Sequence, residues 1–301
     1  MLRWIGIGLA AAALALVAGP ASPAHAQQLH YPGIPWSDLL PPVASPGAHA
    51  EPVPHCRRPG LRCVTNALRR LRAARDRYGC DHRAVFATTY MTLTRVFRGM
   101  IKRDPDLVRF KRYTYIEDAL FANFYFRVLR AWERGDPVPE AWRIAFTAAE
   151  SGDYFGAQDM LLGINAHVQN DMPFVIAALG VRSRKGVSRK PDHDAINAVL
   201  AEAYEPVVRA VRKRYDPSLD LTNPSQVPFD DAAGLEMVRG WREMVWRNAE
   251  RLVNASTASE RADVARSIEI YAGAAAQLIA AAPAPGYGAT RDAYCQAQIG
   301  G

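Results

Sequence analysis

The feature that most constrains this chain is a helical hydrophobic period that begins after Cys63 and continues to about residue 281. Apolar residues recur at spacings of three and four, and Gly, Pro or Asp separate the segments. Neither an alternating strand pattern nor a repeat of fixed period is present. The pattern predicts an all-α fold class, a multi-helix antiparallel bundle-like single domain. We expect helices at about 64–78, 81–102, 106–134, 139–151, 156–180, 192–215, 231–253 and 258–281.

The first 26 residues have the three zones of a secretory signal peptide. Arg3 precedes an apolar run from Ile5 to Gly19, and the segment ends in Ala24-His25-Ala26. The apolar run is shorter than the ~20 residues that a membrane-spanning helix needs. We therefore expect cleavage before Gln27, no transmembrane segment in the mature chain, and a secreted or cell-envelope location.

Three segments follow the predicted cleavage site. Residues 27–62 are expected to form a proline-rich arm, because the eight prolines between residues 27 and 60 do not allow a long helix. Residues 63–282 form the predicted helical domain. Residues 283–301 form a C-terminal tail that we expect a disulfide to tie back to the body.

The four cysteines predict disulfides, since an even number in an exported chain is typical of that chemistry. Cys63 and Cys80 flank a predicted helix whose ends would be roughly 25 Å apart, beyond the ~7 Å that a disulfide allows between Cα atoms. We favour Cys56 with Cys63 and Cys80 with Cys295. The crossed arrangement, in which Cys56 pairs with Cys80, stays open.

The chain carries a net charge of +7. Basic and aromatic residues are not interleaved as they are in nucleic-acid grooves, so we predict no nucleic-acid partner. One basic stretch is either a solvated loop or a docking patch for an anionic component of the cell envelope. Its positive residues are Arg182, Arg184, Lys185, Arg189 and Lys190.

A polar group interrupts the apolar helix predicted over residues 156–180. His167 and Asp171 are one helical turn apart and therefore share a face, with Asn170 beside them. One interpretation is that these side chains satisfy backbone groups that Pro173 leaves unpaired. The other is a ligand or acid–base site, since imidazole and carboxylate together suit a divalent metal or a proton relay.

A metal site would need more ligands than this pair. Zinc or manganese are the metals that we consider, with His167 and Asp171 as candidate ligands. The chain has no G-x-S-x-G, H-E-x-x-H or G-x-x-x-x-G-K-[ST] motif, so the common hydrolase and nucleotide-binding classes lose support. The possible completing ligands are Asp81, His82, Asp118 and Asp194.

Several stretches together resemble a bacterial exported family known as domain of unknown function 5995. The resemblance implies an all-α body with the His167 segment in the family signature, and it implies no activity. A more distant similarity, a His and an Asp one turn apart, is to the zinc-dependent nuclease and phospholipase C group. This chain has only one H-x-x-x-D, and Gln27 stands where those enzymes begin with tryptophan. The stretches that resemble the first family are Gly79–Tyr90, Phe121–Tyr125, Val138–Arg143, Leu161–His167 with Asp171, and Trp246–Glu250.

Two functions follow as hypotheses. The first is a metal-dependent hydrolase of phosphoester or lipid-like substrates, in which a metal-bound water is the nucleophile. The second is a non-catalytic ligand-binding or structural protein of the envelope. Three or more His, Asp or Glu side chains around His167 would favour the enzyme.

Overall fold

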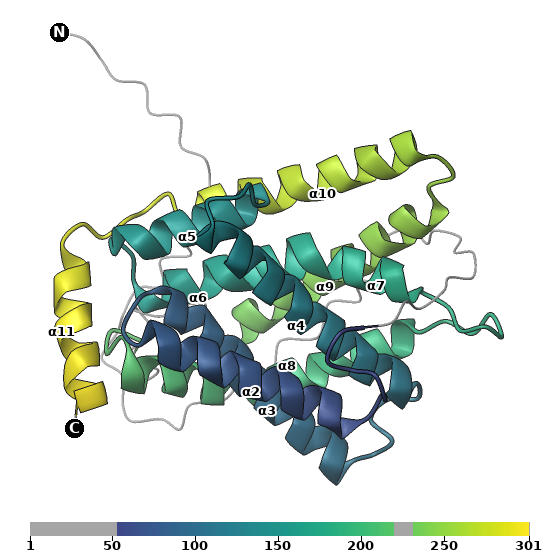
Figure 1. The fold of residues 1–301 in the computed structure, drawn as a ribbon, viewed down its shortest axis with the longest axis horizontal. Helices are drawn as coiled ribbons and strands as arrows, with labels where there is room; N and C mark the ends of the chain where they lie inside the picture. The colour runs from purple at the N-terminus through teal and green to yellow at the C-terminus, as the bar shows by residue number, and fades with distance from the viewer. Residues whose placement is uncertain (1–52, 220–230, 301) are drawn as a thin grey trace, which may run out of the picture. The chain divides into compact units, whose positions relative to one another are not determined.

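The computed structural model describes residues 53–219 and 231–300, and within these ranges its regular elements are helices (Figure 1). The only other regular feature there is an isolated bridge between Arg182 and Ser188. The predicted all-α single domain is confirmed. The predicted signal peptide and residues 27–52 of the arm lie outside the described residues. The helices are α2 (Leu61–Tyr78), α3 (Arg83–Arg103), α4 (Lys111–Glu133), α5 (Glu140–Ser151), α6 (Gly156–Asn165), the π-helix η1 (Ala166–Asp171), α7 (Met172–Leu179), α8 (Lys190–Arg214), α9 (Asp231–Asn254), α10 (Ala258–Ile279) and α11 (Tyr287–Gly300).

The elements α6, η1 and α7 follow one another without a break and are mostly buried. Helices α6 and α7 are largely apolar on either side of the polar η1, and an apolar helix requires neighbours around it. Helices α4, α5, α9 and α10 all pack against η1. Leu162, Ala166, Val175 and Ile176 are completely buried along this central segment.

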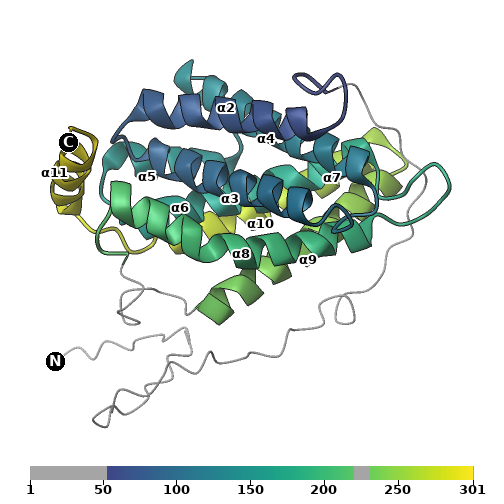
Figure 2. The same cartoon turned by 90° about the horizontal axis from the view of Figure 1, so that it is seen from below.

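Helix α2 lies on the outside of the bundle, and α3 lies between α2 and α8 (Figure 2). The apolar face of α2 repeats at three and four residues through Val64, Ala67, Leu71 and Ala74, and all four are buried. The opposite face of α2 is exposed to solvent. Helix α3 is therefore covered on one side by α2, which precedes it in the chain, and on the other by α8, which comes much later.

Three helix predictions need correction. Helix α4 begins at Lys111 rather than residue 106, because a turn occupies residues 105–106 and the backbone N–H groups of Arg109 and Phe110 donate to the carboxylate of Asp192. The single helix predicted over 156–180 contains the π-helix η1. The tail contains α11, which was not predicted because its sequence has no clear apolar stripe.

The two disulfides join Cys56 to Cys63 and Cys80 to Cys295. This is the pairing that we favoured, so the crossed alternative is wrong. The second disulfide fastens α11 to the turn before α3. Beside it the fully buried Arg291 donates from Nη1 to the carbonyl oxygen of Cys80 at 3.1 Å.

No helix in the described ranges combines the length and apolar character that crossing a bilayer requires. The two disulfides fit a protein that matures in an oxidising compartment.

Candidate acid–base site

The π-helix η1 places His167 and Asp171 at the centre of the fold. Pro173 has no N–H, and its ring would clash with the carbonyl of Gln169 in a regular helix. The wider turn of a π-helix absorbs this conflict, and the N–H of Met172 bonds to the carbonyl of His167, five residues back. Such π-turns occur frequently at functional sites.

Asp171 accepts three hydrogen bonds from side chains. The donors are His167 Nδ1 at 2.9 Å, Trp142 Nε1 of α5 at 2.9 Å and Asn170 Nδ2 at 2.8 Å. The polar side chains thus bind one another and Trp142, and among the described residues no side-chain hydrogen bond from His167, Asn170 or Asp171 to a backbone group near Pro173 is present. Because a carboxylate can only accept, Nδ1 of His167 carries the proton and Nε2 keeps a free lone pair.

Aromatic rings enclose the imidazole of His167. Phe121 stacks on it with ring centroids 3.5 Å apart and an interplanar angle of 6°. Burial lowers the pKa of His167, and the hydrogen bond and charge of Asp171 oppose this effect. The imidazole is therefore neutral at neutral pH, as a general base must be. The other rings around it are Phe86, Tyr90, Tyr125 and Trp142.

Among the buried polar atoms that have no hydrogen-bond partner in the described residues, three bear on this site. They are His167 Nε2, Tyr90 Oη and Asp118 Oδ2. The ring centroids of Tyr90 and His167 are 4.8 Å apart, and the charges of Asp118 and Asp171 help burial to raise the pKa of Tyr90. Asp118 lies one turn before Phe121, the ring that stacks on His167. Unpaired buried polar atoms are costly and call for an explanation.

Two neighbouring carboxyl groups on α4, Glu117 and Asp118, have pKa values raised to near neutral pH. Burial and the charge of Glu117 raise the pKa of Asp118 to about 7. Burial also raises the pKa of Glu117 to about 7, although the charge of Arg242 opposes the change. Both groups are near half protonation at neutral pH, which suits proton transfer.

Arg242 of α9 brings a positive charge next to this region. Its Nη1 contacts the sulfur of Met172, the residue after Asp171, at 3.6 Å, and its Nε donates to Asn197 at 2.8 Å. Burial lowers the pKa of Arg242 to about 10. The guanidinium remains charged at neutral pH and can attract an anion.

A small open pocket leads from the surface to the aromatic rings around His167. Phe86, Tyr125 and Trp142 line this pocket and also contact the imidazole. His82 and Asp159 are its buried polar residues, with His82 Nδ1 2.6 Å from Asp159 Oδ2. The pocket is therefore separated from His167 by one layer of aromatic side chains.

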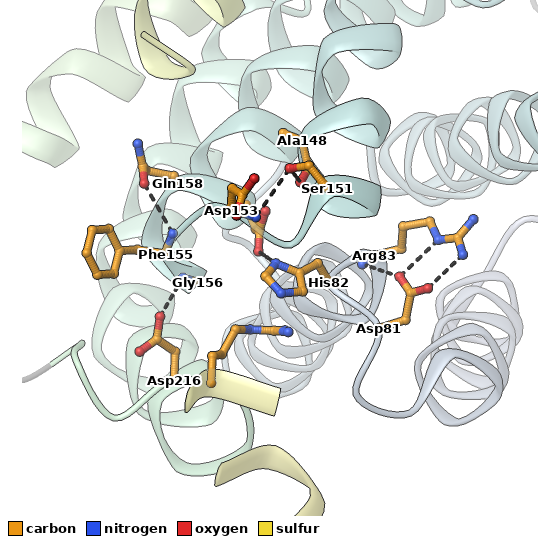
Figure 3. Close-up of polar contacts among 12 residues, drawn as sticks. Asp81, His82, Arg83, Ala148, Ser151, Asp153, Phe155, Gly156, Gln158 and Asp216 are labelled. Atoms are coloured by element: carbon orange, nitrogen blue, oxygen red, sulfur yellow. Dashed lines mark hydrogen bonds and ion pairs between the residues drawn. The ribbon is translucent and has the colours of Figure 1, made fainter. Parts of the chain in front are cut away.

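The predicted completing ligands are dispersed in the structure. In Figure 3, Asp81 binds Arg83, the first residue of α3, through two guanidinium contacts and the backbone N–H. His82 pairs with Asp159, and Asp194 pairs with Lys190 at 2.9 Å. Of the four candidates, the charge of Asp118 helps to raise the pKa of Tyr90 and that of Asp81 the pKa of Tyr125, two of the rings around His167.

Within residues 53–219 and 231–300, no group of three or more His, Cys, Asp or Glu side chains is placed to hold a metal ion. The candidate metal ligands His167 and Asp171 bind each other. Sequence reasoning missed Tyr90 and Trp142 as parts of the site, since aromatic residues at helical spacing are typical of any core. Both residues do lie in stretches that carry the family resemblance.

Only part of the basic stretch, residues 182–190, projects from the body as a loop. Arg189 points inward, with Nη1 donating to the carbonyls of Leu179 and Gly180, and its guanidinium lies over the ring of Tyr113. Lys190 pairs with Asp194 and Glu243. The exposed positive residues that remain at the tip are Arg184 and Lys185.

A family model described as a family of unknown function, DUF5995, matches residues 64–282. No curated protein and no solved structure matches the chain.

Proposed function

The chain belongs to the DUF5995 family, whose function is unknown, and we propose from its own site that it is an exported hydrolase using acid–base chemistry at His167. The observation that carries the proposal is the unpaired Nε2 of His167. Asp171 fixes the tautomer, Trp142 and Asn170 fix Asp171, and the free nitrogen is left inside the fold. His82 and His193 also leave one ring nitrogen without a hydrogen-bond partner among the described residues, and what distinguishes His167 is its place among the aromatic rings, beside the unpaired Oη of Tyr90.

In the proposed reaction, His167 is the general base and Asp118 the general acid. Nε2 takes a proton from water, and the oxygen of that water attacks the phosphorus or carbonyl carbon of an ester. The bond to the leaving alkoxide oxygen breaks, and Asp118 gives that oxygen its proton. The proton on His167 then returns through solvent to Asp118, which restores both groups.

We propose a phosphoester or lipid-like ester as the substrate class, and the pocket, whose volume is only about 20 Å³, would have to widen to admit it. Apolar and aromatic side chains make up most of the lining, among them Phe86, Trp142 and Phe146, and these suit an acyl or alkyl chain. Rotation of Phe86 would open the aromatic layer toward His167. The positive charge of Arg242 would favour an anionic head group or an oxyanion beyond that layer.

The test is hydrolysis of a panel of chromogenic carboxylic esters, phosphomonoesters and phosphodiesters by the disulfide-bonded protein. We expect His167→Gln to reduce the rate by ~10²-fold or more, the usual effect of losing a general base. His193→Gln is a matched control, because His193 is similarly buried and also leaves one ring nitrogen, Nδ1, without a hydrogen-bond partner among the described residues. Equal activity of the two variants, or no activity of the native protein on any ester, would count against the hydrolase.

Measuring the metal content distinguishes two roles for His167, a general base and a metal ligand. We expect dialysed native protein and His167→Ala to hold equal, substoichiometric zinc and manganese when measured by inductively coupled plasma mass spectrometry. Stoichiometric metal that the His167→Ala variant loses would instead support the metal-dependent hydrolase that the sequence suggested.

The alternative is a non-catalytic binding protein of the cell envelope. The stacking of Phe121 on His167 favours it, since a ring covered on its face is well placed to act as a packing element. In that case His167→Gln would lower the melting temperature, and ester hydrolysis would be absent in the native protein as well.

A further inference from the structure

Helix α2 presents a strongly basic face at the surface. Its sequence contains six arginines and one acid, Asp76. Arg62, Arg69 and Arg72 are spaced by seven and three residues, so they share one face. That face lies opposite the buried residues of α2, and all three arginines are exposed.

The positive charge extends beyond α2 itself. Arg57 and Arg58 precede the helix and are exposed. Helix α4 packs beside α2 and adds the exposed Arg127 and Arg130. We call the exposed arginines at positions 57, 58, 62, 69, 72, 127 and 130 the α2 arginine face.

Acidic side chains do not neutralise this face. Asp76 pairs with Arg75 and Glu133 pairs with Arg77, both at the C-terminal end of α2. Arg62, Arg69 and Arg72 have no acidic partner among the described residues; Arg69 contacts only Asn66. Burial lowers the pKa of Arg70, and the charge of Arg130 lowers it further, as expected where positive charges crowd.

We propose that the α2 arginine face is a docking surface for a linear anionic polymer that carries phosphate groups. Guanidinium groups bind phosphate oxygens in a bidentate way, and the row along α2 matches a chain of regularly spaced anions. The charge of the face, unopposed by acids, supplies the attraction. This inference does not depend on the proposed hydrolase.

The same face lacks what a membrane anchor needs. The exposed large apolar residues of the described chain lie on α10, α11 and the residue before α6, and none lies on α2. The apolar face of α2 is buried in the core and cannot insert into lipid. Stable membrane attachment usually requires an apolar insertion as well as charge, so a polymer fits better than a bilayer.

The test measures binding of fluorescently labelled inorganic polyphosphate to the whole disulfide-bonded protein across a salt series. We expect Arg62→Glu/Arg69→Glu/Arg72→Glu to weaken binding at least ~tenfold. The slope of log affinity against log salt should fall by about 2, since each lost phosphate contact contributes roughly 0.7. The matched control is Arg182→Glu/Arg184→Glu/Lys185→Glu, which changes the net charge equally on the projecting loop.

Retained affinity in the loop variant, with loss in the α2 variant, is the result we expect. Equal loss in both variants would show that only net charge matters and would overturn the proposal. Absence of polyphosphate binding by the native protein at low salt would also overturn it, as would stronger binding to anionic phospholipid vesicles or to single-stranded DNA. If the glutamate variant fails to fold, Arg62→Gln/Arg69→Gln/Arg72→Gln gives the same comparison without charge reversal.

Discussion

The indole N–H of Trp142 donates to Oδ2 of Asp171 at 2.9 Å, and this bond joins α5 to the π-turn at the centre of the fold. Both side chains are buried. The same carboxylate oxygen accepts from His167 Nδ1, so Trp142 helps to fix the plane and tautomer of the imidazole. A residue 25 positions before His167 thus positions the proposed base.

The first prediction concerns this bond. Trp142→Phe removes the donor but keeps most of the aromatic volume, so Asp171 loses one of its three partners. We expect a loss of about 1–3 kcal/mol in the free energy of unfolding, the usual effect of removing a partner from a buried group. Urea denaturation measures it. Trp132→Phe is the control, because Trp132 donates to the exposed Glu150 and should cost less.

The second prediction concerns the pH dependence of Asp118. If Asp118 is the general acid, activity should fall as the pH rises through its pKa of about 7, because the proton is then lost. Asp118→Asn should lower the rate and remove that decline. A pH–rate profile of both proteins decides the point, and an unchanged alkaline decline in the variant would contradict the assignment.

The raised pKa of Asp118 also predicts that the stability of the protein depends on pH. The pKa of this carboxyl group is higher in the folded state than the 3.8 of an exposed aspartate, so the folded protein binds more protons between pH ~4 and ~7. Its contribution to the free energy of unfolding therefore decreases as the pH rises through this range. Relative to the native protein, Asp118→Asn should be more stable at pH 8 than at pH 4 by about 4 kcal/mol, measured by denaturant unfolding at both values.

Much of the fold could be predicted because local rules and packing agree. Thr257 and Glu260 form a capping box at the start of α10, as their spacing in the sequence indicates. The recurrence of apolar residues every three or four positions predicts most of the other helices. Helix α11 was missed because tertiary contacts define it: Arg291 is fully buried in a segment whose sequence looks polar. Sequence periodicity does not reveal such a docking interaction.

The candidate site could be predicted only at its centre. The i, i+4 spacing of His167 and Asp171 was sufficient to predict that they share a face, and they bind each other. Tyr90 and Trp142 come from other helices, so their position depends on how α3 and α5 pack. The π-turn could not be predicted from spacing, because it follows from the steric conflict of Pro173 with the preceding turn.

The third prediction concerns the disulfide between Cys80 and Cys295. It closes a loop of 215 residues, so its loss increases the entropy of the unfolded chain. We expect Cys295→Ser to lose about 2–5 kcal/mol and to make α11 sensitive to proteolysis. Cys56→Ser/Cys63→Ser is the comparison, since that disulfide spans only 7 residues and should matter less. Equal sensitivity of α11 in both variants would contradict this role of the long-range disulfide.

The fourth prediction concerns Gly163, which faces Phe86 across the pocket wall. A Cβ at position 163 would lie 2.3 Å from Phe86 Cδ2 and 2.8 Å from Phe86 Cβ, so the phenyl group would have to move. Because Phe86 lines the pocket and contacts the His167 ring, the displacement would reach the site. We expect Gly163→Ala to cost about 1–3 kcal/mol despite the better helix propensity of alanine.

Gly99→Ala is the matched control for this substitution. Gly99 also lies within an α-helix, but its Cβ would meet only the end of the flexible Arg103 side chain, at 3.4 Å. It should be neutral or gain up to about 1 kcal/mol, since alanine reduces the entropy of the unfolded chain. Thermal unfolding and near-ultraviolet circular dichroism of both variants test the idea. If Gly163→Ala is as stable as Gly99→Ala and the aromatic signal is unchanged, Phe86 is not held in place by this contact, and another residue controls access from the pocket to His167.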